Sequence, residues 1–168
     1  AQVDPRKLDR LVQGLKSDER ETWTSAYAAL VDMGLPAARA LEDAVLRRHP
    51  AAGRCILALG EMGEPSNFLF MEDALEVPEL RPYAIEAFVI AEEVIKERLL
   101  EERDLGLCEA YLGWFPEGSM RQQAEILRRE LLAEEAWSRL GRKPRQADLR
   151  AFLARYGDTP SGRKARRS

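Results

Sequence analysis

The sequence of 168 residues is poor in side chains that ligate metals, with one histidine and two cysteines. These are too few nitrogen and sulfur ligands for a zinc site, which usually takes four. No stretch approaches the roughly 18 consecutive apolar residues that would cross a bilayer. The sequence therefore predicts neither a zinc site nor a membrane span. Hydrophobic residues make up 45% of the chain, which is enough to build a core.

Motifs that carry well-known chemistries are also missing. There is no Gly-x-Gly-x-x-Gly pattern, no P-loop and no serine nucleophile elbow. The single histidine, His49, precedes Pro50 at an expected helix end, where it would meet the negative end of the helix dipole. A general base also needs a nucleophile nearby, and the sequence indicates none. We therefore expect a structural role for His49 and a protein that is not an enzyme, with no cofactor and no metal.

What the sequence does contain is an internal repeat. Three sets of positions recur 29 to 30 residues apart: Ala29-Leu30 with Ala58-Leu59 and Ala87-Phe88, Met33-Gly34 with Met62-Gly63, and Leu41-Glu42-Asp43-Ala44 with Met71-Glu72-Asp73-Ala74. Small residues stand three positions before the first set, at Ala26, Cys55 and Ala84. A fixed period of this length is typical of stacked helical hairpins, in which neighbouring copies bury each other's apolar faces.

Capping residues place the helices within each copy. Asp18 suits the start of the first helix, Gly34 suits its end, and Pro36 suits the first turn of the next helix. The second copy turns at Gly63 in the same way. The third copy lacks this glycine, so we expect its helix to run on to Arg103.

The repeat resembles the HEAT-repeat superfamily, and among its members the short bacterial HEAT-like repeats, also called phycobilisome-lyase-type repeats. The residues that carry the resemblance are Ala26, Ala29, Leu30, Met33, Gly34, Cys55, Ala58, Leu59, Met62 and Gly63, with Ala84, Ala87 and Phe88 matching more loosely. The resemblance implies an all-α fold, a right-handed α-α superhelix of hairpin repeats with capping helices. It also implies a scaffold that binds other proteins.

Helices are expected on both sides of the repeats. Asp4-Pro5 begins a helix, Ser119 caps a long one, and Gly141 to Pro144 separates that helix from a last one at Ala147 to Tyr156. The segment 136–166 resembles a tetratricopeptide-like helix pair common in bacterial envelope proteins. We expect one domain over 1–168, with a cap helix at 1–17, HEAT-like repeats at 18–92, C-terminal helices at 93–160 and a basic tail at 161–168.

Charge is unevenly distributed along the chain, whose formal net charge is −3. Residues 1–138 hold 16 Lys and Arg against 27 Asp and Glu, whereas residues 139–168 hold 10 against 2. The basic end could meet nucleic acid or an acidic surface. The alternative is a frayed, solvated end.

Two groups of residues are candidates for binding a partner. Glu42, Asp43, Glu72 and Asp73 could form an acidic stripe for a basic peptide or a metal ion, or could simply be solvated. Trp114 and Phe115 fall in an expected loop, where they could cap the helical stack or anchor a partner. Cys55 takes the place of a small buried residue, and a disulfide with Cys108 is left open.

The leading hypothesis is a non-enzymatic interaction or scaffold module that binds another protein. A ligand- or chromophore-handling protein of the phycobilisome-lyase-repeat type is the second, and nucleic-acid binding through the basic end is the third. The start at Ala1-Gln2 fits either a removed signal peptide or a trimmed chain. We therefore expect a periplasmic or secreted protein, with the cytoplasm as the alternative.

Overall fold

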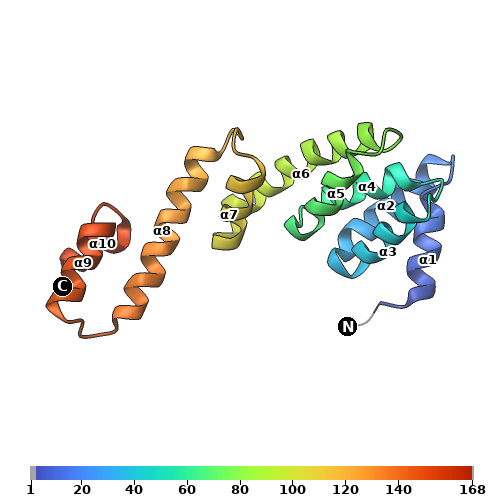
Figure 1. Ribbon diagram of the computed structural model, residues 1–168. Coiled ribbons are helices and arrows are strands. Elements are labelled where there is room, and N and C mark those ends of the chain that lie inside the picture. The colour runs from blue at the N-terminus through green and yellow to red at the C-terminus, as the bar shows by residue number, and fades with distance from the viewer. Residues whose placement is uncertain (1–2, 168) are drawn as a thin grey trace. The chain divides into compact units, whose positions relative to one another are not determined.

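The computed structural model describes residues 3–167, and all regular structure in that range is helical (Figure 1). This confirms the predicted all-α class. The chain divides into two compact units, Ala1–Ile95 and Lys96–Ser168, and each is described by itself. A single repeat domain over 1–168 stays a prediction. Ala1 and Gln2, on which the expected N-terminal processing rests, lie outside the described residues, as does the last residue of the basic tail.

The first unit contains α1 (Pro5–Gly14), α2 (Arg20–Met33), α3 (Leu35–Leu46), α4 (Ala52–Met62), the short 3-10 helix η1 (Pro65–Asn67), α5 (Phe68–Ala74) and most of α6 (Arg81–Glu102). The second contains the end of α6, α7 (Leu105–Trp114), α8 (Arg121–Leu140), α9 (Gln146–Tyr156) and α10 (Pro160–Arg166). Across residues 3–167, every helix is too short or too polar to cross a membrane.

Helix starts depend on local capping, and one of two N-terminal predictions is wrong. At α1 the Asp4 carboxylate accepts a hydrogen bond from the Arg6 N–H at 3.0 Å, as expected. Asp18 does not cap α2, because the N-cap position is Glu19 and its side chain makes no capping hydrogen bond. Ser17 instead accepts a hydrogen bond from the Glu19 N–H at 3.1 Å.

Helix ends follow the glycines that the repeat singled out. The first and second copies end a helix at Met33 and Met62, and the glycines that follow have φ of 64° and 61°. A side chain at such φ values would be strained, so glycine suits both turns. In the third copy α6 continues without a break to Glu102, as its missing glycine predicts.

Small residues let the helices of the first unit approach closely. Ala26, Cys55 and Ala84, the small residues that recur in the three copies, are all buried. A close approach involves Gly60, which the repeat did not single out. A Cβ atom at Gly60 would lie 2.4 Å from the backbone oxygen of Ala87, so α4 and α6 pack almost backbone to backbone.

One arginine ties three helices of this unit together. The Arg54 side chain on α4 donates hydrogen bonds to the carbonyl oxygens of Leu15 and Ser17, at 2.5 and 2.9 Å, just beyond the end of α1. Its guanidinium lies 4.2 Å from the ring centroid of Trp23 on α2. The arginine thus satisfies carbonyls that the helix end leaves free and stacks on an aromatic face.

In the second unit the predicted cap of the long helix is wrong. Helix α8 begins at Arg121 with Met120 as N-cap, and Ser119 accepts a hydrogen bond from the Lys96 ammonium at 3.0 Å. The buried Tyr111 hydroxyl accepts from the Met120 N–H at 3.1 Å, which fixes the α7–α8 turn. The break after α8 is at Gly141, as predicted.

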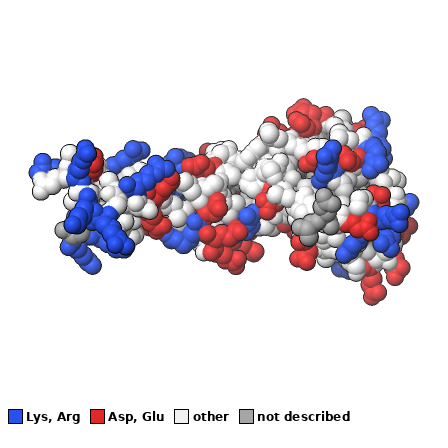
Figure 2. All heavy atoms as spheres, turned by 90° about the horizontal axis from the view of Figure 1, so that it is seen from below, with Lys and Arg blue, Asp and Glu red and all other residues white. Residues whose placement is uncertain are grey.

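The basic end of the chain is folded up to Arg166. Helix α10 is capped by Thr159, which accepts from the Gly162 N–H at 3.1 Å and donates to the Tyr156 carbonyl at 2.6 Å. Ala165 is buried in a small core with Ala133, Phe152 and Tyr156. A frayed end is therefore the wrong interpretation for residues 161–166. Lys and Arg side chains are numerous on the face of these last helices that Figure 2 shows.

Candidate functional site

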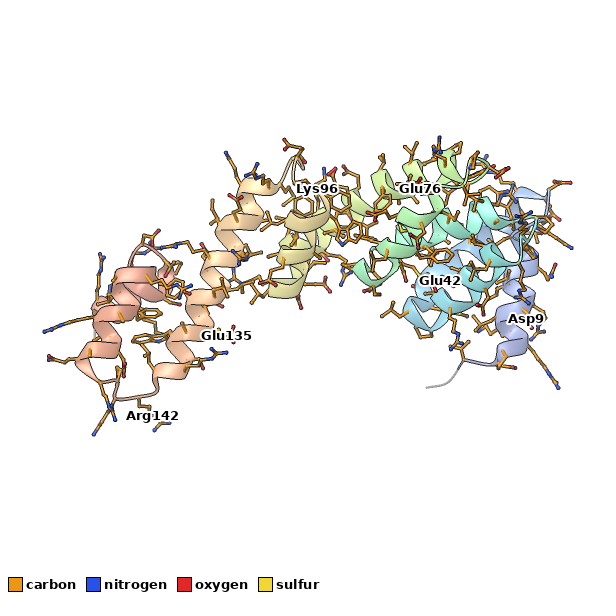
Figure 3. The ribbon with its side chains drawn as sticks, viewed as in Figure 1. Asp9, Glu42, Glu76, Lys96, Glu135 and Arg142 are labelled. Carbon is orange, nitrogen blue, oxygen red and sulfur yellow. The ribbon has the colours of Figure 1, made fainter. Side chains whose placement is uncertain are left out.

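The four acidic residues singled out from the repeat differ in their surroundings. Glu42 on α3 is half-buried, whereas Asp43, Glu72 and Asp73 are exposed (Figure 3 labels Glu42). Burial and the neighbouring Asp43 carboxylate raise the pKa of Glu42 above its usual range. Among residues 3–167, no group of three or more His, Cys, Asp or Glu side chains is placed to hold a metal ion.

One of these acids, Asp73, borders an apolar groove in the first unit. The groove has a volume of about 660 Å³ and lies between the end of α3, the start of α4, and α5 with the turn that follows it. We call it the α3–α5 groove; it is lined by Val45, Leu46, Arg48, His49, Ala52, Phe70, Asp73, Ala74, Val77, Glu79 and Leu80. Its volume is in the range that ligand sites in proteins occupy.

Two large hydrophobic side chains of the groove are left in water. Leu46 is 70% exposed and Val77 is 39% exposed. A single exposed apolar residue is ordinary, but here both belong to one concave surface whose other lining includes Phe70 and Leu80. Covering them would remove apolar area from water, at about 25 cal/mol for each Å² buried.

The charges of the groove have opposite signs on its two sides. Arg48 follows α3, while Asp73 and Glu79 belong to α5 and the turn after it. Of the six Asp and Glu side chains in residues 61–79, only Asp73 and Glu79 line the groove. Arg48 has a φ of 56°, a conformation that is unusual for a residue other than glycine.

His49 has a different role from the one that its position at a helix end suggests. Its Nδ1 atom accepts a hydrogen bond from the Ala51 N–H at 3.0 Å, so that nitrogen carries no proton. Burial and the cations Lys16 and Arg47 lower the pKa of His49. Both effects favour the neutral imidazole, whose Nδ1 accepts a hydrogen bond at the start of α4.

The aromatic pair Trp114-Phe115 lies in the second unit and is packed against its own chain. Trp114 is the last residue of α7 and Phe115 caps that helix, so the predicted loop begins later than expected. Both side chains are half-buried, and the Phe115 ring lies 5.5 Å from the buried Tyr111 ring. They contribute to packing at the end of α7 and not to the α3–α5 groove.

The two cysteines are buried free thiols, one in each unit, so the possible disulfide is absent. Burial raises the pKa of the Cys55 thiol to about 12, which leaves it protonated and unreactive at neutral pH. Neither cysteine lines the groove.

Most of the groove, including Leu46, Phe70, Val77 and Leu80, lies outside the residues that the sequence pattern singled out. A usable signal was present in the segment Leu75-Glu76-Val77-Pro78, where apolar residues continue past the end of α5 into a turn. Apolar residues in a turn, where polar ones are usual, indicate either packing or an exposed contact surface.

Comparison of the chain with protein-family models, with curated proteins and with solved structures gave no match.

Proposed function

We propose that this chain is a non-enzymatic helical module that binds another protein, and that the α3–α5 groove holds a short segment of that partner. The observation that carries the proposal is the pair of exposed side chains, Leu46 and Val77, on one concave apolar surface. An amphipathic partner helix laid in such a groove would cover both with its own apolar residues.

The charges around the groove define the partner segment further. Asp73 and Glu79 favour Lys or Arg beside the apolar residues of the segment. Arg48 on the opposite side favours an acidic residue or the C-terminal end of the bound helix. The partner is therefore a helical segment with an apolar face and a predominantly basic flank.

We also propose that the first unit contains HEAT-like repeats. The α2–α3 and α4–α5 pairs are read as two HEAT-like hairpins of a right-handed superhelix, supported by the 29-residue spacing of Gly34 and Gly63 and by their shared positive φ. The groove then lies where successive hairpins meet, which is where repeat proteins present side chains to partners.

A peptide selection tests the apolar part of the proposal. A displayed library of random 16-residue peptides is selected on the full chain and counter-selected on the Leu46→Asp, Val77→Asp double variant. Enriched peptides should carry apolar residues at helical spacing and Lys or Arg beside them. Their affinity, measured by fluorescence anisotropy, should fall at least about tenfold on the double variant.

Matched control variants distinguish binding in the groove from non-specific hydrophobic binding and from loss of the fold. Leu69→Asp alters an α5 residue that is 66% exposed and outside the groove, and should leave binding unchanged. Asp73→Lys should weaken the peptides, whereas Glu72→Lys, next to it but outside the lining, should weaken them less. Peptides without basic residues, or equal binding to all variants, would refute the proposed groove.

A further inference from the structure

A second concave site lies within the second unit, between α8, α9 and the end of α7. Its volume is about 590 Å³. Four arginines line it, Arg121, Arg128, Arg129 and Arg155, against a single acidic residue, Glu125. We call this site the arginine pocket. Guanidinium groups repel one another, and an anion bound between them would offset this repulsion.

Two of the four guanidiniums are held in place by the fold. Arg129 donates hydrogen bonds to the Arg155 carbonyl and to the Asp158 carboxylate, both at 2.6 Å. The guanidiniums of Arg129 and Arg155 lie 5.7 and 5.4 Å from the ring centroid of the buried Tyr156. Stacking on one ring orients both cations. Arg129 uses its Nη2 donors on the Arg155 carbonyl and the Asp158 carboxylate, which leaves its other N–H groups for a ligand.

The other two arginines can turn toward a ligand at little cost. Arg121 pairs with Glu125 at 3.2 Å and Arg128 pairs with Glu109 at 3.7 Å, and every one of these four side chains is about half exposed or more. Exposed ion pairs of this kind contribute roughly 0 to 1 kcal/mol each. Arg155 has no ion-pair partner among residues 3–167, so its charge is available as well.

The number of guanidinium groups indicates the class of ligand. Three carboxylates lie near the four guanidiniums, Glu125 in the lining and Glu109 and Asp158 beside Arg128 and Arg129, so the group has a formal charge of +1. Planar guanidinium groups bind phosphate oxygens in pairs, so four of them can engage more oxygens than one phosphate group presents. Two linked phosphates present more oxygens and match this donor set better than one. Leu112, Leu132 and Pro116 complete the lining and give an organic group a surface to contact.

We propose that the arginine pocket is a binding site for a small ligand carrying a diphosphate group. Arg129 and Arg155 form the fixed part of the site, and Arg121 and Arg128 close on the ligand from α8. The excess of Lys and Arg in residues 139–168, which include α9 and α10, raises the local concentration of anions.

Calorimetric titration of the full chain with inorganic pyrophosphate tests the site, with orthophosphate and a nucleoside diphosphate as parallel ligands. Pyrophosphate should bind at least about tenfold more tightly than orthophosphate. Tighter binding of the nucleoside diphosphate would identify an organic diphosphate as the ligand, and equal binding would identify the free diphosphate. Absence of pyrophosphate binding at low salt would overturn the proposal.

Two double variants of equal charge distinguish the pocket from its basic surroundings. Arg121→Gln with Arg128→Gln removes two cations from the pocket and should lower the affinity for pyrophosphate at least about tenfold. Arg142→Gln with Arg145→Gln removes two exposed cations from the α8–α9 turn, outside the lining (Figure 3 labels Arg142), and should change affinity less than twofold. Equal weakening by both pairs would show general attraction of anions and overturn the proposal. Circular dichroism melting of each variant confirms that the helices persist.

Discussion

The substitution Gly60→Ala should destabilise the protein, although alanine is the better helix former. In an exposed helix the change would stabilise by about 1 kcal/mol. At Gly60 the new Cβ atom would lie 2.4 Å from the Ala87 oxygen and 2.9 Å from its carbonyl carbon and Cα, all of which are backbone atoms of α6. Ordinary contacts begin near 3.4 Å, so α6 must move away by roughly 1 Å.

The expected net effect follows from these two opposing contributions. Overpacking of this kind costs about 1–3 kcal/mol or more, and a rigid backbone obstacle places Gly60 at the upper end. We expect a net loss of about 1–2 kcal/mol in the free energy of unfolding. Urea unfolding followed by circular dichroism at 222 nm measures it, together with the slope m, which should stay unchanged.

Two other glycines provide controls for the same substitution. Gly113→Ala on α7 meets no atom within 4 Å and should stabilise by about 0.5–1 kcal/mol. Gly53→Ala on α4 meets the ring of Tyr83, a side chain that is 42% exposed and can rotate, so its loss should be smaller than that of Gly60→Ala. A Gly60→Ala protein as stable as the wild type would refute the close approach of α4 and α6.

Two further predictions concern the first unit. Arg54→Ala should lower the free energy of unfolding by about 2 kcal/mol, because two carbonyls lose a charged donor and Trp23 loses its stacked cation. A loss below about 0.5 kcal/mol, measured by urea unfolding, would contradict this. The pKa of His49, followed by the NMR shift of its ring protons, should lie below the 6.5 of a free histidine. Its neutral form therefore contributes to the free energy of unfolding: the contribution is complete above about pH 6.5 and is lost as the pH falls through the lowered pKa. A measured pKa above 6.5 would contradict this prediction.

Local signals determined much of the helical framework from the sequence alone. Gly34 and Gly63 end their helices, Asp4 starts the first one, and the absence of a turn glycine lets α6 run on to Glu102. Each of these outcomes depends on backbone groups within four residues of the side chain concerned, so the local sequence is sufficient to predict it. Asp18 and Ser119 do not cap their helices: the N-cap positions are Glu19 and Met120, neither of which makes a side-chain capping hydrogen bond. Ser119 accepts a hydrogen bond from Lys96, 23 residues away, which local sequence does not reveal.

The two candidate sites depend on residues that are distant in sequence, and only the tertiary structure brings them together. The α3–α5 groove joins Leu46 to Val77, and the arginine pocket joins Arg121 to Arg155. Helical periodicity indicates which face of one helix is apolar, but not which face of another helix lies opposite it. The repeat therefore predicted the helices and their turns, whereas packing decided which apolar and charged side chains share a surface.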